Sequence, residues 1–77
     1  MNLYLIVTTK YLEPINNRGS RVKATLGSES ITVHYQSSMD PSEMHMIAAE
    51  RLLAEMEIKY KRLKGGEIDK GYAFLVE

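Results

Sequence analysis

The amino-acid sequence predicts an α+β fold, a two-layer sandwich in which one helix packs on one face of an antiparallel sheet of four to five strands. Three observations support this class. Short β-branched and aromatic stretches separated by turn residues fill the first half of the chain, an amphipathic segment with a marked helix start follows, and another apolar stretch comes near the end. The expected order of elements is therefore βββαβ or βββαββ.

The length of the chain predicts a single domain over residues 1–77. The chain has 77 residues, 44% of them hydrophobic, which is too short for two cores and too apolar for a disordered tail. A domain of this size buries only about 60% of the surface of its unfolded chain. Cysteine is absent, so neither a disulfide nor a thiolate zinc site can add stability. Pairing with a second copy would help, and we keep a homodimer as a candidate state.

The first twenty residues predict a strand followed by a loop. Residues 3–9 are β-branched or aromatic with little polarity, which predicts a strand. Residues 13–20 predict a loop, because Pro14 cannot donate to a strand ladder and Gly19 accepts positive φ angles freely.

Alternating apolar and polar residues predict two further strands, at residues 21–26 and 31–36, joined by a turn at residues 27–30. Such alternation is typical of an antiparallel sheet with one exposed face. We expect Tyr4 and Ile6, or the opposite set of the first strand, to share that exposed face with the polar residues of these two strands. The polar residues are Arg21, Lys23, Thr25, Thr32, His34 and Gln36.

A helix is predicted from Pro41 to about Met56. Asp40 occupies the position of an N-cap acceptor, Pro41 the first helical position, and Glu43 stands three residues after the cap. An apolar stripe then follows at helical spacing. We expect the Asp40 side chain to accept hydrogen bonds from the first-turn amides.

Residues 58–64 allow two interpretations. The apolar stripe could continue as helix, or the alternation could form a strand. We favour a helix that ends near Glu57 and a short edge strand after it. The glycines at 65–66 and the segment 69–71 are expected to interrupt regular secondary structure, and residues 72–76 are expected to form the last strand.

Charge is balanced overall but unevenly distributed. Ten basic and ten acidic side chains cancel, with an acidic middle at residues 38–58 between two basic ends. Zero net charge argues against two classes of protein, the globally cationic nucleic-acid binder and the strongly acidic DNA mimic. The apolar run at residues 3–7 has no basic segment before it and is too short to cross a bilayer, which predicts a cytoplasmic protein without a membrane partner.

The best candidate binding segment is the loop and strand start at residues 16–23. Glycine-containing turns can direct backbone N–H groups at an anion, and two arginines three residues apart can add forked contacts to phosphate or carboxylate. The alternative is a connection whose residues merely satisfy turn geometry. The candidate contact residues are Asn17, Arg18, Ser20, Arg21 and Lys23.

A second candidate is the basic run at residues 59–64, in which Tyr60 is interleaved with Lys61 and Arg62. Such a run can follow a phosphate backbone or dock on an acidic partner. The alternative is a solvated edge strand whose lysines discourage sheet-to-sheet aggregation. His34, on the expected exposed face, completes the set of candidate contact residues.

No motif predicts catalysis, a cofactor or a metal. The two histidines, His34 and His45, lie on different predicted elements, lack a paired spacing and have no cysteine near them. None of the serines stands in a Gly-x-Ser-x-Gly sequence. We therefore expect a non-enzymatic protein that uses neither cofactor nor metal.

The segment TKYLEPINNRGSRVKA, residues 9–24, resembles the opening of small proteins encoded by tailed bacteriophages and prophages. The resemblance continues more loosely over most of the chain. It implies an accessory protein in the cytoplasm of a bacterial host that binds a host protein or protein complex, for example to inhibit a defence system such as CRISPR-Cas or restriction. The alternative is a small nucleic-acid-binding module that uses the open sheet face and the 16–23 loop.

Overall fold

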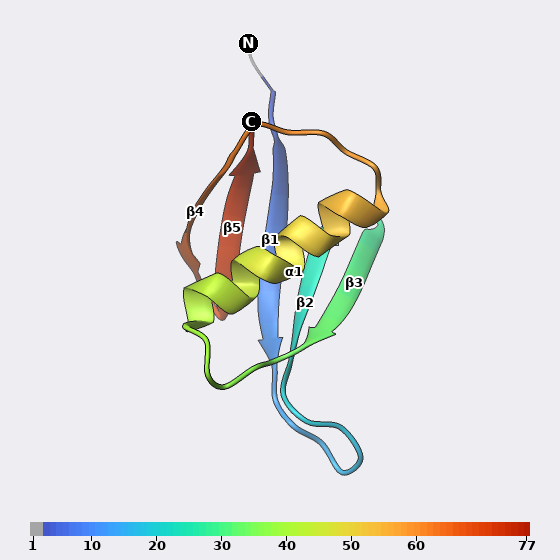
Figure 1. Cartoon of the computed structure of the whole chain (residues 1–77), viewed down its shortest axis with the longest axis vertical. Helices are drawn as coiled ribbons and strands as arrows, with labels where there is room; N and C mark the ends of the chain where they lie inside the picture. The colour runs from blue at the N-terminus through green and yellow to red at the C-terminus, as the bar shows by residue number, and fades with distance from the viewer. Residues whose placement is uncertain (1–2) are drawn as a thin grey trace.

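The computed structural model describes residues 3–77 and contains five strands and one helix. The elements are β1 (Leu5–Leu12), β2 (Arg21–Leu26), β3 (Glu29–His34), α1 (Pro41–Glu55), β4 (Leu63–Ile68) and β5 (Gly71–Val76). All five strands form one antiparallel sheet in the order β3-β2-β1-β5-β4, and α1 runs obliquely across one face of it (Figure 1). The predicted α+β class is confirmed, with the order βββαββ.

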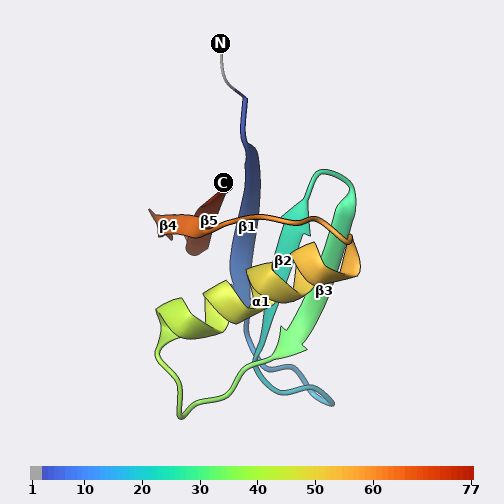
Figure 2. The same cartoon turned by 45° about the horizontal axis from the view of Figure 1, so that its top comes forward.

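The core lies between the sheet and α1, which lies in front of β1, β2 and β3 in Figure 2. Its largest fully buried side chains are Phe74, Leu52, Leu53, Val7 and Val22. Complete burial of one such side chain contributes about 1.5–3 kcal/mol to stability. This single layer of contacts fixes which face of every strand is covered.

The predicted strands are present, with shifted bounds. β1 begins two residues later than expected and runs three residues further, because its last residues pair with the start of β2 through Leu12 and Arg21. The predicted alternation in β2 is confirmed, since Val22 and Ala24 are fully buried and Lys23 is exposed.

The helix begins at Pro41 as predicted, but the expected side-chain cap is absent. Asp40 has the extended backbone of an N-cap residue, but its carboxylate accepts no hydrogen bond from the first-turn N–H groups. The backbone oxygen of Asp40 instead accepts the bond from the Met44 N–H, at 3.0 Å. The prediction of a capping carboxylate is therefore wrong, although the sequence pattern located the helix start correctly.

Two backbone hydrogen bonds end the helix. Glu57 has a left-handed φ of 56°, its N–H donates to the Ala54 oxygen at 3.1 Å, and the Ile58 N–H donates to the Leu53 oxygen at 2.9 Å. These bonds form a Schellman motif, which stops a helix by reversing the chain. The favoured helix end near Glu57 is confirmed, and the alternative of a helix continuing through residues 58–64 is wrong.

The predicted edge strand is displaced along the chain. β4 covers Leu63–Ile68, so Gly65 and Gly66 lie inside a strand and do not break it. A β-carbon on Gly65 would collide with the ring of Phe74, which pairs with Gly65 across β4 and β5. Glycine is required here by ring packing, a tertiary cause that a turn-former interpretation misses.

Candidate functional site

The face of the sheet opposite α1 is covered by no other element among residues 3–77, and we call it the open face. The strand registers place alternate residues of all five strands on it. These residues are Ile6, Thr8, Lys10 and Leu12 of β1; Arg21, Lys23 and Thr25 of β2; Ser30, Thr32 and His34 of β3; Lys64, Gly66 and Ile68 of β4; and Gly71, Ala73 and Leu75 of β5. The question left open for β1 is therefore settled in favour of the set that contains Ile6.

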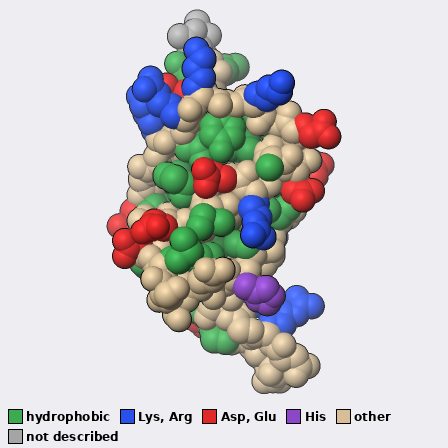
Figure 3. Space-filling view, viewed as in Figure 1, with side chains coloured by type: hydrophobic (Ala, Val, Ile, Leu, Met, Phe, Trp, Pro, Cys, Tyr) green, Lys and Arg blue, Asp and Glu red, His purple; other side chains and the backbone are tan. Residues whose placement is uncertain are grey.

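The open face carries only basic residues at its charged strand positions, although the Glu77 carboxylate approaches the Lys64 ammonium at 3.0 Å from beyond the end of β5. Its charged positions are Lys10, Arg21, Lys23 and Lys64, and none of the strand positions that the registers place there is Asp or Glu. The acidic side chains from the middle of the chain lie on or next to α1: Asp40, Glu43, Glu50, Glu55 and Glu57. Figure 3 views the α1 face and shows acidic groups there. The open face and the exposed side of α1 thus differ in the sign of their charge, while other charged side chains, among them Lys59, Lys61 and Arg62, lie at the end of the sheet.

Two lysines face each other at the centre of the open face. Lys10 and Lys23 are direct cross-strand partners in the pairing of β1 with β2, and both are exposed. Like charges placed directly opposite each other destabilise a sheet. Within residues 3–77 the only ion pairs join Glu77 to Arg62 and to Lys64, so neither lysine has a carboxylate partner there.

A shallow hollow of about 430 Å³ lies over this lysine pair. The hydroxyl-bearing residues Thr8 and Thr25 line it together with both lysines. Lys70, from the β4–β5 turn, adds a further cation, and Asp69 is the one acidic residue at the hollow. Ammonium groups beside hydroxyls form a suitable surface for the oxygens of an anion.

The predicted binding loop forms a protruding hairpin, which we call the arm and define as residues 13–20 (Figure 1). Ile15 and Arg18 exchange two backbone hydrogen bonds, of 2.9 and 3.0 Å, around the exposed turn at Asn16 and Asn17. Because the N–H groups of Ile15 and Arg18 are used within the arm, they are not directed at an anion. Ser20 is occupied as well, since its hydroxyl lies 2.8 Å from the Tyr11 hydroxyl.

Arg21 joins the arm to the open face. Its Nε donates to the Gly19 oxygen at 3.1 Å and its Nη2 donates to the Glu13 oxygen at 3.5 Å. A guanidinium has five N–H donors, so three remain for an external acceptor. Arg21 and Lys23 lie on the same face of β2, and the structure brings these two predicted site residues together with Lys10.

The second predicted cluster, Lys61 and Arg62, lies apart from the first. Both residues line a hollow with Tyr4, Tyr60 and Glu77, at the end of the sheet away from the arm. The Lys64 ammonium at 3.0 Å, a hydrogen-bond partner, holds the pKa of Glu77 below its usual value, with a further contribution from the Arg62 guanidinium. This carboxylate engages Arg62 and Lys64, whereas Lys59 and Lys61, which line the same hollow, have no carboxylate partner among residues 3–77.

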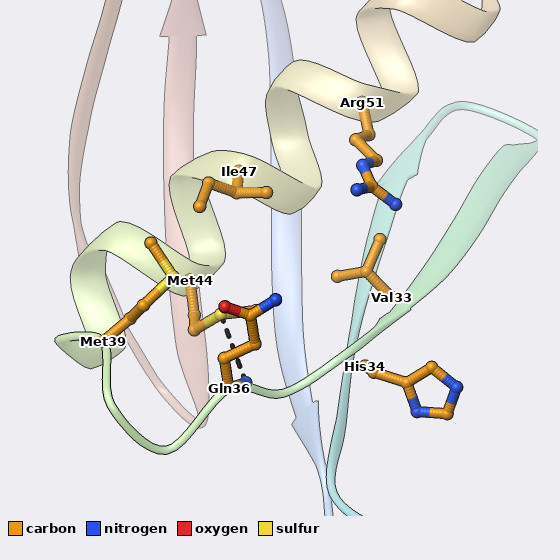
Figure 4. Close-up of a pocket in the computed structure, with 7 residues that line it drawn as sticks. All are labelled: Val33, His34, Gln36, Met39, Met44, Ile47 and Arg51. Atoms are coloured by element: carbon orange, nitrogen blue, oxygen red, sulfur yellow. Dashed lines mark hydrogen bonds between the residues drawn. The ribbon is translucent and has the colours of Figure 1, made fainter.

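His34 and Gln36 were predicted to share the open face, but only His34 lies there. Gln36 lies beyond the end of β3 and lines a pocket of about 350 Å³ between α1 and the β3–α1 connection, where its backbone N–H donates to the Met44 sulfur at 3.4 Å (Figure 4). His34 is at the margin of this pocket, with its ring pointing away from Met39 and Met44 (Figure 4). The alternation that holds within β3 therefore stops where the strand stops.

The second histidine, His45, lies between α1 and the sheet. His45 is 4% exposed and Thr9 is 3% exposed, and the His45 Nδ1 lies 2.7 Å from the Thr9 hydroxyl oxygen. The ring of Tyr72 covers the imidazole at a centroid distance of 4.7 Å. Burial lowers the pKa of His45 from its usual 6.5 and favours the neutral ring.

Among residues 3–77, no three His, Cys, Asp or Glu side chains are grouped so that they could hold a metal ion. The same part of the chain has no helix with the length and apolar character needed to cross a membrane. No family model, curated protein or solved structure matches the chain. The fold and the site thus define a small α+β domain with an exposed basic sheet face, and its function must be argued from the chemistry of that face.

Proposed function

We propose that the protein is a non-enzymatic nucleic-acid-binding module whose open face contacts the phosphate backbone. The observation that carries this proposal is the segregation of charge, with Lys10, Arg21 and Lys23 adjacent on a face whose registers place no acidic residue there. Clusters of basic residues on one surface supply most of the affinity in nucleic-acid binding, and they do so without sequence preference.

The spacing of the cations suits a row of phosphates. Lys10 and Lys23 lie opposite one another on neighbouring strands whose backbones are about 5 Å apart. The backbone of Arg21 is two residues, or about 7 Å, from that of Lys23 along β2. Long, flexible lysine stems let the ammonium groups adapt to the phosphates they meet. The hydroxyls of Thr8 and Thr25 beside them add neutral hydrogen bonds, of the kind that positions a protein on a phosphate backbone.

Charge segregation removes the objection that a neutral chain binds polyanions poorly. Net charge controls steering over long distances, whereas the contact itself responds to charges within about 10 Å at 0.1 M salt. The carboxylates of Glu50 and Glu55 belong to α1, on the far side of the sheet. We therefore expect binding through the open face alone, with an affinity that is moderate and strongly dependent on salt.

Paired alanine variants test the proposal by fluorescence anisotropy with random duplex and single-stranded oligonucleotides at low salt. The double variant Lys10→Ala/Lys23→Ala should lose affinity by about 10-fold or more, because two phosphate contacts are removed. Arg51→Ala removes one cation from the exposed surface of α1 and serves as the control, with an affinity close to that of the wild type. Absence of wild-type binding, or equal losses in Arg51→Ala and in a single Lys23→Ala variant, would refute the proposal.

A second candidate function, the binding of a host protein, is favoured by the pocket beside α1. Met39, Met44 and Ile47 line it, and methionine side chains adapt readily to a partner surface (Figure 4). A photo-crosslinking residue at position 47 would test this candidate. A specific host protein captured by the wild type and by Lys23→Ala, but lost in Met39→Asp, would support it, whereas a wild type that captures none would reject it.

A further inference from the structure

The arm continues the hairpin of β1 and β2 beyond the sheet as a two-stranded ribbon. Its end is a tight turn in which only Asn16 and Asn17 separate the mutually hydrogen-bonded residues Ile15 and Arg18. Figure 1 shows the arm extending past the other elements. A narrow ribbon with exposed sides is shaped to enter a groove.

The base of the arm is held in place by several contacts. Arg21 bridges the outgoing and returning strands through the carbonyl oxygens of Glu13 and Gly19. Tyr11 bonds to Ser20 and packs edge to face on Tyr35 at a centroid distance of 5.5 Å. The Tyr35 N–H also donates to the Ser20 oxygen at 3.0 Å. An arm fixed in this way loses little conformational entropy when it binds.

The tip carries the side chains that read bases. Asn16, Asn17 and Arg18 are exposed, and within residues 3–77 their side chains make no hydrogen bond or ion pair. In the major groove of DNA, asparagine pairs with adenine and arginine with guanine, while apolar groups contact the thymine methyl. Ile15, 62% exposed at the same tip, supplies an apolar group.

The dimensions fit B-form DNA. The lysine pair is five residues behind the tip on each strand, about 16 Å at 3.3 Å per residue. The major groove is about 8.5 Å deep and about 12 Å wide, and it admits a two-stranded ribbon. With the tip on the groove floor, the backbone at Lys10 and Lys23 lies about 8 Å outside the groove, so these lysines reach the phosphates at the groove edge only through extended side chains.

Other nucleic acids fit this surface less well. The registers place no aromatic residue on the open face, so single-stranded bases would find no stacking platform among those strand positions. The major groove of an RNA duplex is too narrow and deep for side chains to read. We propose that the arm is a reader of the major groove of duplex DNA, an inference that rests on the proposed function of the open face.

Selection from a pool of duplexes with a random central segment tests this inference. The wild type should enrich a short sequence motif and bind it at least about 10-fold more tightly than random duplex. The variant Asn16→Ala/Asn17→Ala/Arg18→Ala should still bind random duplex but enrich no motif. Lys23→Ala, the control, should enrich the same motif with weaker overall affinity. Methylation of guanine N7, which lies in the major groove, should block binding of the wild type to the motif.

The outcomes separate this inference from the proposed function. If the wild type binds no nucleic acid, both fail. Any one of four results would show that the arm does not read the major groove, while the proposal for the open face stands. The wild type binds duplex DNA but enriches no motif, or it prefers single strands. Alternatively, the motif is still bound by the arm variant, or by the wild type after N7 methylation. A melting curve checks that the arm variant is folded, and single Asn17→Ala and Arg18→Ala variants give the same test if the triple variant does not fold.

Discussion

At the scale of single residues, His45 shows how the fold determines the state of a side chain. Its position in the first turns of α1 was visible in the sequence, but its burial depends on how α1 crosses the sheet. That crossing places the imidazole against Thr9 of β1 and Tyr72 of β5, two residues far from it in the chain. No local pattern contains this information.

Burial of His45 predicts a loss of stability in mild acid. Its pKa is lowered in the folded protein, so the unfolded chain binds the proton more readily. The contribution of the neutral His45 ring to the free energy of unfolding is complete above pH 6.5. It declines as the pH falls below that value, by at most about 1.4 kcal/mol per pH unit. Urea midpoints between pH 8 and pH 5 measure it.

Two glutamine variants complete this experiment. His45→Gln removes the titrating group and should flatten the pH dependence, while His34→Gln, at an exposed position, should leave it unchanged. The ion-paired Glu77, with a lowered pKa, loses its contribution only below its usual value of 4.5, outside the range measured. An unaltered slope in His45→Gln would contradict the account.

Replacement of Asp40 by alanine should have a small effect. The carboxylate makes no capping hydrogen bond, so only its interaction with the helix dipole is lost. We expect a decrease of less than about 0.5 kcal/mol in the free energy of unfolding, against about 1 kcal/mol for the loss of a bonded cap. A loss of the larger size, measured by urea unfolding at pH 7, would show that the cap forms in solution.

At the scale of elements, the sequence predicted the strands whose own residues alternate, and it misplaced the edge strand β4, whose glycines are required by packing against the neighbouring strand. The alternation in β2 indicated correctly that Arg21 and Lys23 share a face. Lys10 was not among the predicted site residues, because the parity of β1 is fixed only by its register with β2 and β5. β4 was displaced because its glycines were interpreted as breakers.

Two adjacent glycines in β4 give a matched test of this explanation. Gly65→Ala should reduce the free energy of unfolding by about 1–3 kcal/mol, since the new methyl group collides with the Phe74 ring. Gly66→Ala should change it little, because no atom lies within 4 Å of the added carbon. Similar urea midpoints for the two variants would mean that Gly65 does not lie under the ring.

The lysine pair predicts opposite effects on stability and on binding. Lys23→Glu replaces a repulsive cross-strand pair with an attractive one and should raise the free energy of unfolding by about 0.2–1 kcal/mol. The same change should weaken nucleic-acid binding more than Lys23→Ala does. Destabilisation by Lys23→Glu, seen as a lower urea midpoint, would show that the two side chains do not face each other as the register requires.

At the scale of the whole molecule, a neutral chain is organised into a basic face and an acidic face. The sequence showed the acidic middle and the basic ends, and the fold places the acidic middle on the α1 side of the sheet and Lys10, Arg21 and Lys23 on the other, while Lys61 and Arg62 lie at the end of the sheet. Composition alone argues against a polyanion as the partner, whereas the arrangement in space favours one. The sequence could not show how the two candidate segments lie in space, and the fold brings the arm and residues 61–62 to opposite ends of β1.

The salt dependence of nucleic-acid binding tests the central claim most directly. Each phosphate neutralised adds about 0.7–0.9 to the slope of log affinity against log salt concentration. With Lys10, Arg21 and Lys23 in contact, the wild-type slope should be about 2–3 in magnitude, and Lys10→Ala/Lys23→Ala should lower it by about 1.4–1.8 while Arg51→Ala leaves it unchanged. A wild-type affinity that is absent, or insensitive to salt, or a slope equal in all three proteins, would contradict the assignment of the open face as the binding surface.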